Sequence, residues 1–137
     1  MDEAAISDEW PSDAVFLSSG RESGPKLLRD CAAFMDRYGF EEVEWITFSV
    51  EGTARDCSIG LWFVDDVVEP FDFVEPAVEW PRPDLLRYVG SGRLSQAGLR
   101  EIAQALDAEH ATSIVAIRLS QIFEDELFEV LVFVGDY

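Results

Sequence analysis

The sequence predicts an α+β fold, a two-layer sandwich of two main helices on a mostly antiparallel sheet of four to six strands. Three observations predict it. Residues 24–39 and 95–110 carry apolar side chains at helical spacing. Each stretch is followed by two runs with the composition and alternation of β-strands, and 137 residues fit one domain. We therefore expect the order helix, hairpin, helix, hairpin around one core.

The N-terminal part is divided by composition. Residues 1–13 are acidic, and we expect them to be poorly ordered, with a single α+β domain over 14–137. Residues 14–18 suit a short first strand, and the Ser- and Gly-rich stretch 18–24 suits a loop.

The first helix has both end signals. Ser23 is the expected N-cap, Pro25 suits the first turn, and Gly39 supplies the stop. The expected core stripe is Leu27, Leu28, Cys31, Phe34, Met35 and Tyr38.

Residues 41–50 and 57–64 are expected to form the first hairpin, around a turn at 51–56. Period-two spacing places side chains on one face of each strand: Ile46, Phe48 and Val50 on the first, and Cys57, Ile59, Leu61 and Phe63 on the second.

The second half repeats this order without evident sequence identity to the first. Residues 85–89 suit either a short strand or a helical turn. Ser95 can cap the second helix, whose apolar stripe is Leu99, Ile102, Ala103 and Leu106. The nearly continuous apolar runs 112–123 and 126–134 predict a last hairpin of central strands.

Charge excludes some partners. Asp and Glu number 28 against ten Lys and Arg, so the formal net charge is −18. This field repels phosphate backbones and anionic lipid surfaces, so we expect no direct nucleic-acid or membrane partner. It attracts basic proteins. The same charge is also explained by solubility alone, or by adaptation to a salty habitat.

No targeting or chemical motif stands out. The acidic start lacks a secretory signal pattern, which predicts a cytoplasmic protein. Cys31 and Cys57 are expected to be buried, reduced thiols. His110 is the only histidine, and no His or Cys cluster supplies a metal site. We therefore expect no metal, no cofactor and no catalytic residue.

Residues 63–83 combine acids, aromatic rings and four prolines, of which Pro70, Pro76 and Pro81 each follow Val-Glu or Val-Glu-Trp. Proline excludes a regular central strand, so this segment is expected at an edge or on the surface. One interpretation is an edge kept from pairing with other chains by charge and proline. The other is a partner-binding surface formed by Asp65, Asp66, Glu69, Phe71, Asp72, Phe73, Glu75, Glu79 and Trp80.

A glycine-rich loop at 89–96 offers an alternative site. A loop that enters a helix presents N–H groups and a positive dipole end, which suit an anion. The candidate anion-binding residues are Gly90, Gly92, Arg93 and Ser95. Neither a dinucleotide fingerprint nor a Walker lysine accompanies them.

These observations favour a small, acidic, soluble binding protein over an enzyme. The expected partner is a basic protein, such as a toxin or nuclease whose active site this chain occludes as an inhibitor or immunity-type protein. An anion-binding or enzymatic domain using 89–96 and a self-associating structural domain remain alternatives. The sequence leaves the oligomeric state open.

Overall fold

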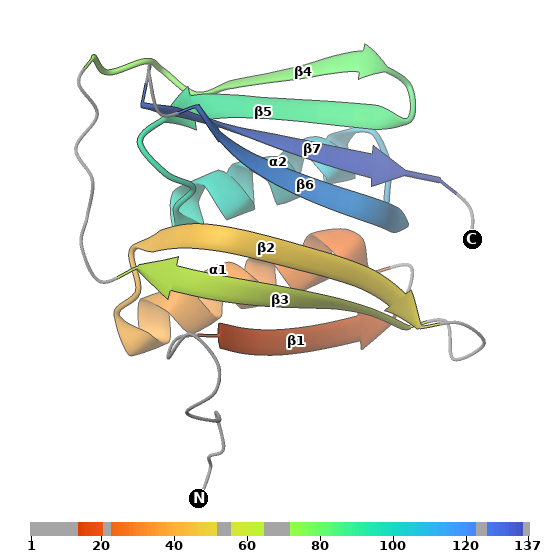
Figure 1. Ribbon diagram of the computed structural model, residues 1–137. Coiled ribbons are helices and arrows are strands. Elements are labelled where there is room, and N and C mark those ends of the chain that lie inside the picture. Colours follow the sequence, from red (N-terminus) through yellow and green to blue (C-terminus); the bar gives the residue numbers. More distant parts are fainter. Residues whose placement is uncertain (1–13, 21–22, 52–55, 65–71, 123–125, 136–137) are drawn as a thin grey trace, which may run out of the picture.

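The structure is a computed structural model that describes residues 14–20, 23–51, 56–64, 72–122 and 126–135 (Figure 1). The elements are, in chain order, β1 (Ala14–Gly20), α1 (Gly24–Tyr38), β2 (Glu42–Glu51), β3 (Asp56–Val64), β4 (Ala77–Arg82), β5 (Leu85–Ser91), α2 (Gln96–Ala108), β6 (Ile114–Ile122) and β7 (Leu127–Val134). The expected acidic segment 1–13 lies outside the described residues.

The strands form two antiparallel sheets, ordered β1-β3-β2 and β4-β5-β7-β6. The α+β class is confirmed. The prediction of one sheet with four to six strands is wrong, because the described residues hold seven strands in two sheets. Strand β2 of one sheet contacts β6 of the other, and both helices lie behind the strands in the view of Figure 1.

The two halves of the chain share one topology. In β1-α1-β2-β3, the last strand pairs with both the first and the middle strand of the unit. The unit β5-α2-β6-β7 has the same order of pairing. Strand β4 has no counterpart in the described part of the first unit. It pairs with β5 and extends the sheet by one strand. The short first strand expected at 14–18 is present as β1, and the stretch expected as a strand or a helical turn at 85–89 is the strand β5, although the summary order helix, hairpin, helix, hairpin did not include them.

The core lies between the helices and the inner faces of the strands. All four expected core residues of α2 and all four of β3 are buried, as periodicity predicts. In α1, Tyr38 is an exception with 57% of its surface exposed, and Phe34 is only partly buried against the core. Arg29 of α1 pairs with Asp107 of α2 at 2.6 Å, and Arg100 pairs with Asp36, so ion pairs join the two helices.

The helix ends agree with the sequence in part. The Ser95 hydroxyl accepts a hydrogen bond from the Gly98 N–H at 3.4 Å, as expected of an N-cap. Ser23 precedes α1 but makes no side-chain cap, because its backbone angles differ from those of a capping residue. Gly39 ends α1 in the left-handed conformation that glycine permits. Neither helix is long and apolar enough to cross a membrane, among the residues described.

Candidate functional site

Strand β4 is one of the two outer strands of the four-stranded sheet and pairs with β5. Every residue from 72 to 82 is exposed except Trp80. The ladder shifts register between Glu79 and Arg82, which is where Pro81 lies, and a proline is tolerated at such an irregularity. We call residues 72–82 the β4 edge. It presents backbone and side chains to solvent on an ordered strand.

Five of the nine predicted partner-binding residues fall in the described β4 edge. Asp72, Phe73, Glu75 and Glu79 are exposed, and Trp80 is half-buried against the core. The other four, Asp65, Asp66, Glu69 and Phe71, lie outside the described residues.

Apolar side chains are exposed between these acids. The large apolar side chains exposed in the described part of the chain are Tyr38, Trp45, Phe73, Val74 and Val78. Three of them lie within 73–78, and Phe73 is the most exposed, at 71%. Because exposed apolar groups that cluster beside polar ones are typical of contact surfaces, this part of the β4 edge suits binding. Phe73 was predicted as a partner-binding residue, whereas Val74 and Val78, which are also exposed, were not.

Two sets of contacts hold the β4 edge on the sheet. The Ser91 hydroxyl accepts a hydrogen bond from the Val74 N–H at 2.9 Å and donates one to the Val74 carbonyl at 3.0 Å. Arg87 on β5 donates to Glu129 on β7 at 2.6 Å and to Glu79 on β4 at 2.5 Å. The hydrogen bond to Glu129, and then that to Glu79, raises the pKa of the Arg87 guanidinium. One cation thus joins three strands on their solvent side.

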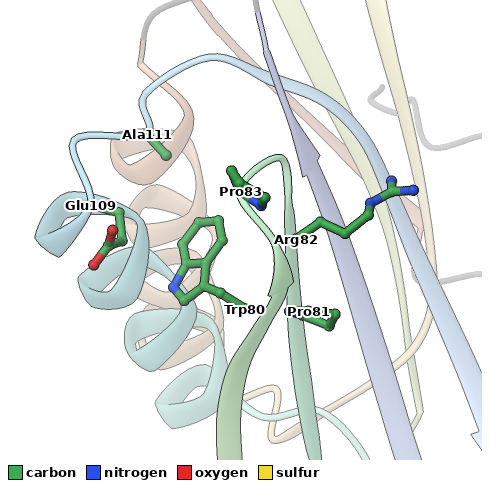
Figure 2. Close-up of a pocket in the computed structure, with 6 residues that line it drawn as sticks. All are labelled: Trp80, Pro81, Arg82, Pro83, Glu109 and Ala111. Carbon is green, nitrogen blue, oxygen red and sulfur yellow. The ribbon is translucent and has the colours of Figure 1, made fainter.

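Trp80 lines a pocket between β4 and the end of α2. The pocket has a volume of about 480 Å³ and is lined by Trp80, Pro81, Arg82, Pro83, Glu109 and Ala111. Figure 2 shows the indole between the strand and the helix, with Glu109 on the helix side and Arg82 directed away from the ring. The sequence placed Trp80 near a contact surface but gave no sign that Glu109, 29 positions later, lies on the same pocket.

The candidate anion-binding residues of the 89–96 loop mostly make contacts within the protein. The Gly92 N–H donates to the Glu126 carbonyl at 2.7 Å, and the Gly98 N–H donates to the Ser95 hydroxyl. At Gly90, a Cβ atom would lie 2.9 Å from Phe128 Cε1, so this glycine serves close packing of β5 against β7. Arg93 follows on a half-buried loop position. These contacts supply no converging set of N–H groups within the described loop, and anion binding stays a prediction.

The described residues contain no group of three or more His, Cys, Asp or Glu side chains placed to hold a metal ion. His110 lies two residues past α2, in the left-handed conformation with φ 56°, and is exposed. Cys31 and Cys57 are buried and form no disulfide within the part of the chain that the structure describes, which agrees with the prediction of buried, reduced thiols.

A second exposed aromatic position lies on the three-stranded sheet. Trp45 is 53% exposed and sits opposite Trp62 in the β2–β3 ladder. The alternation that places Ile46 and Phe48 toward the core assigns Trp45 to the other face, so the sequence held the signal for this residue. Trp45 is the one large apolar side chain exposed on the described part of its sheet, whereas three such side chains gather on the β4 edge.

Comparison of the chain with family models, with curated proteins and with solved structures finds no match. Function therefore has to be inferred from the residues of this chain.

Proposed function

We propose that this protein binds a basic protein partner through the β4 edge. The observation that supports it best is the combination, on one edge strand, of exposed carboxylates with exposed apolar side chains. Phe73, Val74 and Val78 lie beside Glu75 and Glu79 in the exposed stretch 72–82. Carboxylates speed the encounter with a positive surface, and desolvated rings slow dissociation.

The place of β4 in the fold supports the same proposal. The two β-α-β-β units supply the core, whereas β4 contributes only the partly buried Trp80 to it. Because β4 buries so little of its surface, we expect it to contribute little to stability. The hydrogen bonds between Val74 and Ser91 and the ion pair between Glu79 and Arg87 nevertheless hold the β4 edge in place. A pre-ordered edge loses less conformational entropy on binding than a free segment.

In its specific form, the proposal is an inhibitor or immunity-type protein that covers the basic active site of a toxin or nuclease. The net charge of −18 gives such a protein long-range attraction to a surface that itself binds phosphate. Cys31 and Cys57 are reduced thiols within the described residues, which suits a reducing compartment, so we place the protein in the cytoplasm. We also infer that the helices and sheets form a two-layer sandwich that supports the β4 edge.

The partner is tested in two steps. The full chain, immobilised through a tag, is used to capture proteins from a lysate of its source at low salt, and captured proteins are identified and purified. Binding of each purified candidate is then measured by calorimetry with the Asp72→Lys/Glu75→Lys variant. The matched control is Glu41→Lys/Glu44→Lys, which changes net charge equally at two exposed acids, one directly before β2 and one within it.

We expect the β4-edge variant to weaken binding at least about tenfold and the control to change it about twofold, since close charge pairs contribute more than a diffuse field. An equal loss of affinity in both variants would mean that only net charge matters, and no loss of affinity in either would refute the proposed site. Phe73→Ala adds a test of the apolar contact. Because Phe73 is exposed, its removal should raise the dissociation rate without lowering stability.

Self-association is the second candidate, because β4 forms the outer edge of its sheet and exposes Val74 and Val78 beside it. It predicts a mass that rises with protein concentration in light scattering. A constant monomer mass over a hundredfold range of concentration would exclude it.

A further inference from the structure

We propose that the pocket between β4 and the end of α2 binds one arginine or lysine side chain of the basic partner. This inference rests on the proposed function and names the chemical group that the β4 edge would recognise. The pocket adjoins the exposed acids of that edge through Trp80, which belongs to both. A single interface can therefore use the edge and the pocket together.

The indole of Trp80 supplies the first element of cation recognition. Tryptophan has the most favourable ring for a cation above its face, and Arg guanidinium groups stack on it readily. Trp80 is half-buried, so the core holds its ring in one position while part of it faces the pocket. Figure 2 shows the ring lying between β4 and α2.

Negative charge at the helix end supplies the second element. Glu109 is the C-cap of α2, and its carboxylate makes no ion pair with any described residue. A helix C-terminus carries partial negative charge, and the last turn of α2 has no basic residue to offset it. Asp107, in that turn, is already paired with Arg29. The uncompensated charge beside the indole is therefore that of Glu109 and the helix end.

The cation that lines the pocket, Arg82, is directed elsewhere. Its Nε lies 3.1 Å from Asp84 Oδ1, and Figure 2 shows its side chain running away from the Trp80 ring. It leaves the space beside Trp80 open. Pro83 and Ala111 form apolar walls, which suit the methylene stem of a long basic side chain. A volume of about 480 Å³ is ample for one such side chain.

The test is an NMR titration of the full-length protein, with the indole Nε1–H signals as reporters. The probe is N-acetyl-arginine methylamide, and the control probe is the citrulline analogue, which has nearly the same shape and no charge. Trp80→Phe serves to assign the signal. We expect a saturable shift at Trp80 with a Kd on the order of 10 mM for arginine, because one small contact set gives weak affinity. The citrulline analogue should bind at least about threefold more weakly.

Glu109→Gln should weaken arginine binding about two- to fivefold, the range expected for an exposed charge pair. Glu44→Gln, a matched change at an exposed acid of the other sheet, should leave it unchanged. Three results would overturn the inference: no saturable shift at Trp80, equal affinity for both probes, or equal affinity in both variants. The N-acetyl-lysine methylamide probe should behave as arginine does, and its failure alone would restrict the site to guanidinium groups.

The two proposals fail separately. If Asp72→Lys/Glu75→Lys abolishes partner binding and the arginine probe does not bind, the pocket is wrong and the β4 edge stands. If the probe binds as described and no partner responds to that charge reversal, the pocket is a cation site and the proposed function is wrong.

Discussion

Arg87 links the candidate surface to the rest of the sheet at the scale of single residues. Its guanidinium bridges Glu79 on β4 and Glu129 on β7, and only 24% of the Glu129 side chain is exposed. We expect Arg87→Gln to lower the free energy of unfolding by about 1–2 kcal/mol, because it leaves a half-buried carboxylate without its partner. Arg87→Lys should recover part of this loss, since an ammonium group keeps the charge but not the forked geometry.

Urea denaturation followed by circular dichroism measures these values. Arg82→Gln is the matched control, because the Arg82–Asp84 pair is more than half exposed on both sides. It should cost no more than about 0.5 kcal/mol. Equal losses at Arg87 and Arg82 would contradict a special role for the bridge.

Cys31 gives the protein a predictable response to alkaline pH. Burial, and secondarily the charge of Asp30, raises the pKa of the Cys31 thiol from 9.0 to about 12. The unfolded chain releases this proton above about pH 9 while the native state keeps it. Stability from this group is therefore complete below pH 9 and is lost as pH rises toward 12, with a slope approaching about 1.4 kcal/mol per pH unit.

The measurement compares wild type with Cys31→Ala by urea denaturation at pH 8, 9.5 and 10.5. The alanine variant has a constant packing loss, so wild type should lose its advantage as pH rises. Burial, and then the hydrogen bond to Glu101, also raises the pKa of Tyr88, but this group is present in both proteins and responds equally in each. A difference that stays constant across the three pH values would contradict the prediction.

Residue identity predicted the acidic and aromatic character of the candidate site but not its shape. Asp72, Phe73, Glu75 and Glu79 were identified because prolines and acids exclude a central strand, a local argument. Glu109 was not identified, because its approach to Trp80 depends on how α2 packs against the sheet. Contacts between distant segments have no periodic signal in a single sequence.

At the scale of elements, α1 begins where glycine allows close packing between the two halves of the chain. A Cβ atom at Gly24 would lie 2.6 Å from Ile114 Cγ1 and 2.8 Å from the Thr112 carbonyl oxygen. The Gly24 N–H also donates to that carbonyl at 2.9 Å. The first turn of α1 thus touches the chain that enters β6.

We expect Gly24→Ala to lower the free energy of unfolding by about 1–3 kcal/mol, because the added methyl group overpacks this contact. The change would stabilise an isolated helix, so the sign distinguishes tertiary packing from helix propensity. Gly135→Ala is the control, since a Cβ atom added there would meet no described atom within 4 Å. Thermal unfolding of both variants gives the comparison, and a stabilised Gly24→Ala would show that the contact relaxes easily.

The helices and last hairpin were predictable because each has a strong local pattern. The sequence signal for strands β1 and β5 was weaker, since each is seven residues long. Their positions in the sheets depend on pairing with β3 and β7, respectively. Recognising them turns the expected helix–hairpin order into two β-α-β-β units. Their shared pairing order depends on strand neighbours, which alternation within one strand does not specify.

At the scale of the whole molecule, charge is distributed in a way that the fold only partly compensates. Within the described residues, Lys26, Arg29, Arg82, Arg87 and Arg100 all pair with carboxylates. Acids exceed bases by 18, so most carboxylates repel one another across the surface. Self-repulsion of this kind destabilises the compact state relative to the expanded chain.

The protein should therefore become more stable as salt is added. Raising NaCl from 20 mM to 500 mM shortens the screening length from roughly 20 Å to roughly 4 Å, so repulsion between distant acids falls most. The same salt weakens the surface ion pairs, but each of these contributes at most about 1 kcal/mol. We expect the melting temperature to rise by several degrees, measured by circular dichroism, and the rise to shrink in Asp72→Lys/Glu75→Lys because that variant carries four fewer net negative charges. A melting temperature that falls with salt would mean that the local ion pairs stabilise the protein more than repulsion between distant carboxylates destabilises it. The effect of each surface acid on stability would then depend on the residues next to it and not on the net charge of the protein.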